Sequence, residues 1–290
     1  MLNRYSRHLQ TIFVALFLSI FHVPGSAQAP ASAEQERQNL IRFLQQKFPG
    51  TTPNDWALGA EGLAAARGAA PLVIPFDADN ATNSADILAI GKKTWERKFK
   101  DGKTLANCFP NGGKRVANTY PQYDSKNKQV VTLEMALNRC LQLHSEAPID
   151  TSDIRVIGPL VAYFRSLAEG QKMAVRVNGA GAMDKFSAGK ALFQRRIGQQ
   201  NFACASCHVR NAGETFRNVM LSPVVGQAAT WPRLAPGGAV RTLQSQFRLC
   251  MKRSGAEPFV PGSEELNDLE YYHTYLSNGM SISRLMPLPH

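Results

Sequence analysis

The sequence predicts a mostly α-helical protein whose two halves repeat the same order of elements. Three observations lead to this fold class. A set of motifs recurs along the chain, each half closes on a stretch with helical periodicity, and a Gly- and Ala-rich segment, EGQKMAVRVNGAGAMDK (169–185), separates the halves. We therefore expect tandem domains over residues 28–175 and 176–290, after a leader at residues 1–27.

The leader has the pattern of a secretory signal peptide. Arg4 and Arg7 precede a short apolar core, TIFVALFLSIFHV, and cleavage after Ala27 avoids a proline directly behind the scissile bond. An apolar run of about 13 residues is too short for a membrane span, which needs about 20. We expect an exported, periplasmic chain without a membrane span, in an oxidising compartment.

Charge is unevenly distributed along the chain. The leader contains two arginines and no acidic residue, so without it the formal charge of +11 becomes +9. Residues 183–255 contain eleven Lys or Arg and only two acids, Asp184 and Glu214, whereas residues 256–290 are mainly acidic. A basic field favours anionic substrates or acidic partners, although a solvated basic face has the same composition. No basic run interleaved with aromatic residues is present, which argues against nucleic acid as a partner.

The repeat consists of matched motifs in matched order. Three pairs of motifs recur: GKKTWERKFKDGKTLANCF (91–109) with GKALFQRRIGQQNFACASCH (189–208), TYP (119–121) with TWP (230–232), and TLEMALNRC (132–140) with TLQSQFRLC (242–250). In the first pair Gly91 matches Gly189 and, after a one-residue gap, Cys108 matches Cys207. The predicted closing helices, with apolar residues three and four apart, are 153–170 and 265–279.

The second half contains a cofactor motif that the first half has lost. Cys204-Ala-Ser-Cys207-His208 is the spacing for c-type haem attachment, with two thioether bonds and one axial imidazole. In the first half Leu105 replaces the first cysteine and Phe109 replaces the histidine. Repeated twice, this arrangement resembles the class I cytochrome c architecture. We therefore expect one covalently bound haem c, in the second half only.

The repeat also assigns the remaining cysteines. Cys207 and Cys250 are expected to border one haem-sized space, so the matched Cys108 and Cys140 are expected to close on one another as a disulfide in the half without haem. Cys250 is then unpaired and becomes the predicted distal iron ligand, opposite His208, where a thiolate lowers the iron potential. The alternatives are a disulfide from Cys250 to one of the other two, an intermolecular disulfide, and an ordinary buried thiol.

A different distal ligand would indicate a different function. Four residues are the alternatives: Met220, Met251, Met280 and His273. Met220 is only twelve residues past the motif histidine, Met251 points about 100° away from Cys250 on a helix, and the repeat supports neither of the other two. Methionine or histidine ligation predicts a periplasmic monohaem electron-transfer cytochrome. A lone thiol beside the iron also suits a haem-based redox sensor.

The signal peptide, the two halves, CASCH (204–208) and TLQSQFRLCMKRSGAEPF (242–259) together resemble the SoxA family, the catalytic cytochrome subunits of SoxAX complexes in bacterial sulfur oxidation. The resemblance covers about residues 34–285 and implies the form in which a disulfide replaces the first haem. It implies an L-cysteine S-thiosulfotransferase, which couples thiosulfate oxidatively to a cysteine of the carrier SoxYZ. The electrons pass through haem c to a small cytochrome c.

The resemblance also implies roles for a partner and for single residues. A SoxX-type small cytochrome is the implied partner subunit, and Cys250 is the implied catalytic sulfur, commonly a persulfide in the family. SoxA proteins typically place an arginine four residues before that cysteine, where this chain has Gln246. Cationic side chains must hold an anionic substrate beside an anionic ligand, and Arg248 is the predicted substrate-binding residue. Three other cations are alternatives if the loop folds suitably: Arg241, Lys252 and Arg253.

Overall fold

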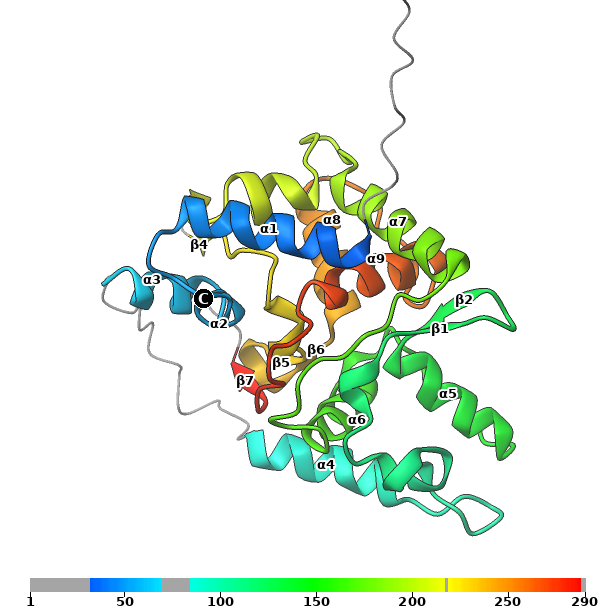
Figure 1. Cartoon of the computed structure of the whole chain (residues 1–290). Coiled ribbons are helices and arrows are strands. Elements are labelled where there is room, and N and C mark those ends of the chain that lie inside the picture. The colour runs from blue at the N-terminus through cyan, green and yellow to red at the C-terminus, as the bar shows by residue number, and fades with distance from the viewer. Residues whose placement is uncertain (1–31, 69–83, 217–218, 288–290) are drawn as a thin grey trace, which may run out of the picture. The chain divides into compact units, whose positions relative to one another are not determined.

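The computed structural model describes residues 32–68, 84–216 and 219–287, so the predicted leader at 1–27 lies outside the described residues. The described chain is mostly helical, which confirms that part of the predicted fold class (Figure 1). Its α-helices are α1 (Ala33–Lys47), α2 (Pro53–Ala57), α3 (Ala60–Ala66), α4 (Ser84–Glu96), α5 (Leu133–Leu143), α6 (Ile154–Ser166), α7 (Ala180–Gln194), α8 (Leu243–Arg253) and α9 (Glu264–Tyr275).

Short turns and strands connect these helices. The turns are η2 (Leu105–Cys108), η3 (Pro110–Gly113), η4 (Ala117–Thr119), η5 (Ser206–Arg210), η6 (Gln227–Thr230) and η7 (Pro236–Gly238). The strands are β1 (Gln122–Asp124), β2 (Gln129–Val131), β3 (Thr215–Phe216), β4 (Val219–Met220), β5 (Arg233–Leu234), β6 (Val240–Arg241) and β7 (Met286–Pro287). β1 pairs with β2 and β3 with β4, both antiparallel, and β5 lies between antiparallel β6 and parallel β7.

Each half is built on one closely packed helix pair, α4 with α6 in the first and α7 with α9 in the second (Figure 1). The matched glycines of the repeat lie at these crossings. A Cβ atom on Gly91 would clash with the backbone of Pro159, and a Cβ atom on Gly189 would clash with the backbone of Asp268. Because glycine has no side chain, the two helices of each pair can approach closely at this position.

The middle helices of the two halves begin in the same way. Thr132 and Thr242 are the N-caps of α5 and α8, and each hydroxyl accepts a hydrogen bond from the backbone N–H three residues later. The matched TYP and TWP turns both contain a cis proline. Local structure in the two halves thus follows the alignment of their motifs.

The space between the halves contains a buried charged cluster. Arg165 of α6 is 7% exposed, and the Glu134 and Glu270 carboxyls that act on it come from α5 and α9. Its Nη2 donates to the Ala228 carbonyl at 2.9 Å. Burial raises the pKa of both carboxyls above the usual range, while the arginine charge opposes that rise. This cluster ties α6 to η6 and α9, so the two halves share one interior.

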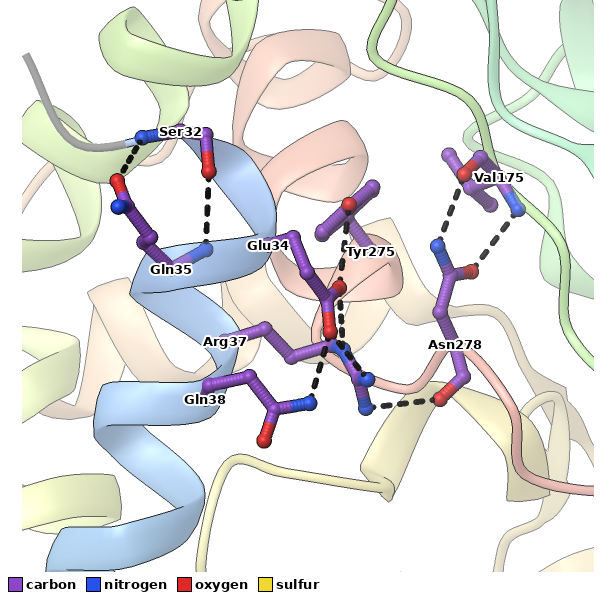
Figure 2. Close-up of polar contacts among 8 residues, drawn as sticks. All are labelled: Ser32, Glu34, Gln35, Arg37, Gln38, Val175, Tyr275 and Asn278. Carbon is purple, nitrogen blue, oxygen red and sulfur yellow. Dashed lines mark hydrogen bonds and ion pairs between the residues drawn. The ribbon is translucent and has the colours of Figure 1, made fainter.

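Helix α1 packs on the second half of the repeat. Figure 2 shows its polar contacts: Arg37 pairs with Glu34 at 2.7 Å and also donates to the Asn278 carbonyl at 3.1 Å. The Asn278 side chain in turn bonds both backbone groups of Val175, in the connection between the halves. Lys190 of α7 adds an ion pair to Glu36 at 2.7 Å. These contacts therefore hold α1 against the half that carries the haem motif.

Candidate haem and thiol site

The haem-attachment motif follows α7, where the chain turns into η5. Ser206 tightens this turn, because its backbone N–H donates to the Ala203 carbonyl at 2.9 Å and its hydroxyl accepts from the Ala203 N–H at 3.1 Å. Cys204 and Cys207 are half-buried free thiols. Both sulfur atoms are therefore available for thioether bonds.

His208 is oriented as an axial ligand requires. Its Nδ1 lies 2.8 Å from the Ser222 carbonyl oxygen. A carbonyl can only accept, so Nδ1 carries the hydrogen and Nε2 keeps its lone pair for a metal. Burial lowers the pKa of His208, which favours the neutral imidazole that binds metals. The residue thus has the tautomer and the charge state of a haem ligand.

A second histidine lies behind His208, on its Nδ1 side. Gln227 has its Nε2 3.2 Å from His208 Nδ1 and accepts through Oε1 from His273 Nε2 at 2.9 Å. Burial, and then the charge of His208, lower the pKa of His273 to about 3. His273 is therefore neutral, and its Nε2 is already used in the contact with Gln227, on the Nδ1 side of His208.

The cysteines of the first half are joined to one another. Cys108 and Cys140 form a disulfide with Cα atoms 5.8 Å apart, which is the pair that the repeat singles out. Cys250, on α8, is a free thiol. Of the five cysteines, the three free ones are therefore those that the repeat places around the haem.

The three free thiols lie within electrostatic reach of one another. Burial raises the pKa of Cys250, and the charge of Cys207 raises it further. Burial likewise raises the pKa of Cys204 to about 12, with contributions from both other thiols. Such mutual destabilisation of thiolates is relieved when two sulfurs become thioethers and the third binds a metal cation. The donor set therefore fits a c-type haem.

Two arginines act electrostatically on the Cys250 sulfur. The positive charges of Arg253 and Arg241 both act to lower the pKa of Cys250 against the effect of burial. Arg241 donates from Nη1 to Gln246 Oε1 at 3.1 Å, and Gln246 Nε2 donates to Cys250 Sγ at 3.5 Å. Gln246 thus connects an arginine of β6 to the thiol, from the position where the family resemblance leads us to expect an arginine.

Comparison with known proteins identifies the family of this chain. The model of the SoxA/TsdA cytochrome c domain matches residues 90–173 and 188–282, the two halves of the repeat. The SoxA subunit of L-cysteine S-thiosulfotransferase from Chlorobaculum tepidum is 40% identical over 263 residues, covering 87% of this chain and 89% of that protein. The chain belongs to the SoxA family. It is an L-cysteine S-thiosulfotransferase subunit, and the predicted enzyme class is confirmed.

Two further relatives support the family assignment and the fold. The SoxA subunit from Allochromatium vinosum is 30% identical over 281 residues, covering 94% of this chain and 96% of that protein. The crystal structure of SoxXA from P. pantotrophus superposes with a TM-score of 0.64 over 71% of this chain and 78% of that one, at 24% identity. As in a SoxA cytochrome c domain, haem c is the implied cofactor.

The structure places Arg248 away from the thiols. It lies two residues before Cys250, about 200° around the helix, and lines a crevice with Glu134 of α5.

Sequence reasoning missed Ser222, Gln227 and the position of His273 beside Gln227. Ser222 and Gln227 can be recognised in the sequence only as polar residues near the motif, because hydrogen bonds across 14 to 46 residues leave no periodic pattern.

Within the described ranges, no helix is both long and apolar enough for a membrane crossing.

Proposed function

We propose that this chain carries out thiosulfate coupling at Cys250. Thiosulfate and a carrier cysteine are joined into a cysteine S-thiosulfonate, one S–S bond forms, the carrier thiol releases one proton, and two electrons leave. The observation that carries this proposal is the free Cys250 thiol, grouped with Cys204 and Cys207 in a chain whose other two cysteines form a disulfide. An electron carrier has no use for such a thiol.

Cys204 and Cys207 would attach one haem c, with His208 and Cys250 as its axial ligands. When bound, that haem accepts the electrons that the S–S bond formation releases. His208 holds its Nε2 toward the iron through the Nδ1 bond to Ser222. The first half has Leu105 and Phe109 in place of ligands, and its cysteines are bridged. We therefore propose a single haem.

Arg241 and Arg253 are the proposed anion-binding residues, in place of Arg248. Thiosulfate is a dianion, and a thiolate at Cys250 would repel it. The two guanidinium groups supply the opposing charge, since both act electrostatically on that sulfur. Gln246 keeps Arg241 near the thiol by bonding both of them. These contacts favour an anionic sulfur substrate over a neutral one.

The proposal extends to compartment and partners. A chain with a disulfide and a thioether-linked haem suits the periplasm, to which the N-terminal leader is expected to direct it. A SoxX-type small cytochrome is the proposed partner subunit, by analogy with the SoxXA complex whose fold this chain shares. SoxYZ is the proposed carrier of the acceptor cysteine.

Replacement of Cys250 by methionine tests the chemical role of the thiol. Cys250→Met keeps an axial sulfur donor but no nucleophile, so we expect haem absorbance to be retained and thiosulfate coupling to fall below detection. The measurement is S-thiosulfonate on the carrier, by intact mass, with a cytochrome acceptor. Met251→Leu, at the adjacent buried position, is the matched control and should keep full turnover. Retained coupling in Cys250→Met would exclude the proposed role.

A further inference from the structure

The disulfide of the first half borders a cavity that the proposed thiosulfate chemistry does not use. The cavity has a volume of about 400 Å³, and both Cys108 and Cys140 line it. Its other walls come from β1, β2 and α5 and include Tyr120, Tyr123 and Arg139. The charge of Arg139 is balanced by Asp124 of β1 at 3.0 Å. A small polar molecule therefore has both room and a mixed aromatic and polar wall beside the S–S bond.

The two sulfur-bearing residues differ in access. Cys140 is 3% exposed and lies within the core cluster, whereas Cys108 is only partly buried, at the end of η2. An incoming sulfur nucleophile would therefore meet Cys108 first. Thiol–disulfide exchange depends on which sulfur is attacked and on how readily the other one leaves. The buried Cys140 sulfur would then be the leaving group.

A histidine lies beside this leaving group. His144 is one helical turn after Cys140, and one of its ring nitrogens lies within 4.8 Å of both sulfur atoms. Its Nδ1 is 2.7 Å from Asp101 Oδ2, and its ring packs on Phe99 with centroids 5.2 Å apart. The side chain is only 9% exposed. Asp101 and Phe99 thus fix the imidazole next to the S–S bond.

We propose that Cys108–Cys140 is a thiol–disulfide exchange site for a low-molecular-weight thiol, with His144 as proton donor to the leaving sulfur. The thiolate attacks Cys108 and forms a mixed disulfide there. The Cys108–Cys140 bond breaks, and the Cys140 sulfur takes the proton of the His144 imidazolium. The incoming sulfur is oxidised and Cys140 is reduced, so the step needs no other oxidant. It goes beyond the proposed function and uses none of its residues.

Charged residues surround the imidazole. Asp101 contacts it directly, and Lys103 acts on that carboxylate. Glu146, two residues after the histidine, is paired with Arg97 at 3.1 Å. Asp101 therefore fixes the ring through Nδ1, and removal of the imidazole tests the proton transfer to the leaving sulfur.

The experiment uses the haem-loaded protein and 2-mercaptoethanol, with quenching by iodoacetamide and peptide mass mapping. We expect the first adduct on Cys108, with Cys140 alkylated. At pH 7 the rate per thiolate of His144→Gln should drop roughly 100-fold, the lower end of what a positioned general acid contributes, and that of Asp101→Asn should lie between this rate and the wild-type rate. Leu143→Ala is the matched control, since Leu143 lines the same cavity and is 76% exposed.

Three outcomes would overturn the proposal. They are an intact disulfide under excess thiol, an adduct on Cys140, and a His144→Gln rate equal to that of the wild type. The thermal unfolding midpoint of each variant is measured in parallel. A variant that only loosens the fold would expose the disulfide and exchange faster, which is opposite to the expected change.

Discussion

The two halves of this SoxA-family chain place different aromatic side chains on one scaffold. Phe109 matches His208 in the aligned motifs, and Phe164 matches His273 because the closing helices align at their glycine crossings. The two phenylalanines contact each other with ring centroids 4.6 Å apart, whereas Gln227 lies between the two histidines, accepting from His273 Nε2 and placing its Nε2 3.2 Å from His208 Nδ1. One half thus has an aromatic contact where the other has two imidazoles and an amide.

The cysteines differ in the same sense. Cys108 and Cys140 are bonded, while the matched Cys207 and Cys250 remain separate thiols in the second half. A disulfide holds its two Cα atoms within a few ångströms of one another, so it leaves no room for a porphyrin between them. The comparison shows that loss of the haem motif is accompanied by a covalent bond between the two cysteines, so no haem can lie between them.

The largest expected effect comes from replacing His208 by phenylalanine, the residue at the matched position 109 of the first half. His208→Phe removes the imidazole whose Nδ1 the Ser222 carbonyl holds, leaving Nε2 free for a metal. We expect the thioether-bound haem to lose its low-spin axial pair and thiosulfate coupling to fall at least about 100-fold, since even outer-shell losses at metal sites reach that size. Absorbance spectra and S-thiosulfonate formation on the carrier measure the two effects.

Phe109→Leu is the matched change in the first half. It reduces packing against Trp95 and Phe164 and is expected to lower the free energy of unfolding by about 1–2 kcal/mol with the haem spectrum unchanged. Equal spectral effects in the two variants would contradict the assignment of His208 as the sole motif ligand.

The second prediction concerns the disulfide. In the double variant Cys108→Ser, Cys140→Ser, the chain-entropy model for a loop of 32 residues predicts a loss of about 3–4 kcal/mol in the free energy of unfolding. Urea unfolding followed by far-UV circular dichroism measures it. Haem content should stay at one per chain. A gain of a second haem, or an unchanged free energy of unfolding, would contradict the view that the disulfide stabilises a half that cannot bind haem.

Local features were predictable from the sequence because they depend on neighbouring residues. The free thiol at Cys250 and the mostly helical fold follow from motif alignment and periodicity. Long-range placement did not follow. Gln227 contacts His273 across 46 residues, and α1 contacts α9 across more than 200 residues, through Glu36 and Tyr272. Neither leaves a periodic signal.

The third prediction tests the supporting histidine. His273→Phe copies Phe164 of the first half and removes the donor to Gln227 Oε1. Outer-shell partners of a metal ligand typically contribute 10–100-fold to affinity or activity, so we expect thiosulfate coupling to fall roughly tenfold with haem attachment retained. Redox titration of the haem should show a shifted midpoint. Wild-type turnover together with a wild-type midpoint would show that the Gln227–His273 contact does not act on His208.

The smallest expected effect is a pH dependence at the glycine crossing of the second half. Asp268 lies where the first half has Pro159 at the glycine crossing, and burial raises its pKa to about 7, with Lys185 opposing that rise. A raised folded-state pKa means that this carboxyl contributes stability at acidic pH that is lost as pH rises from about 4 to about 7. Asp268→Asn should therefore flatten the fall in the free energy of unfolding across this range and leave the variant relatively more stable at pH 8. Asp184→Asn, on the exposed side of α7, should keep the wild-type slope. If the free energy of unfolding of Asp268→Asn, measured in urea at pH 5 to 8, changed with pH as it does in the wild type, Asp268 would not be the source of the pH dependence. The crossing at Asp268 would then be as insensitive to pH as the crossing at Pro159.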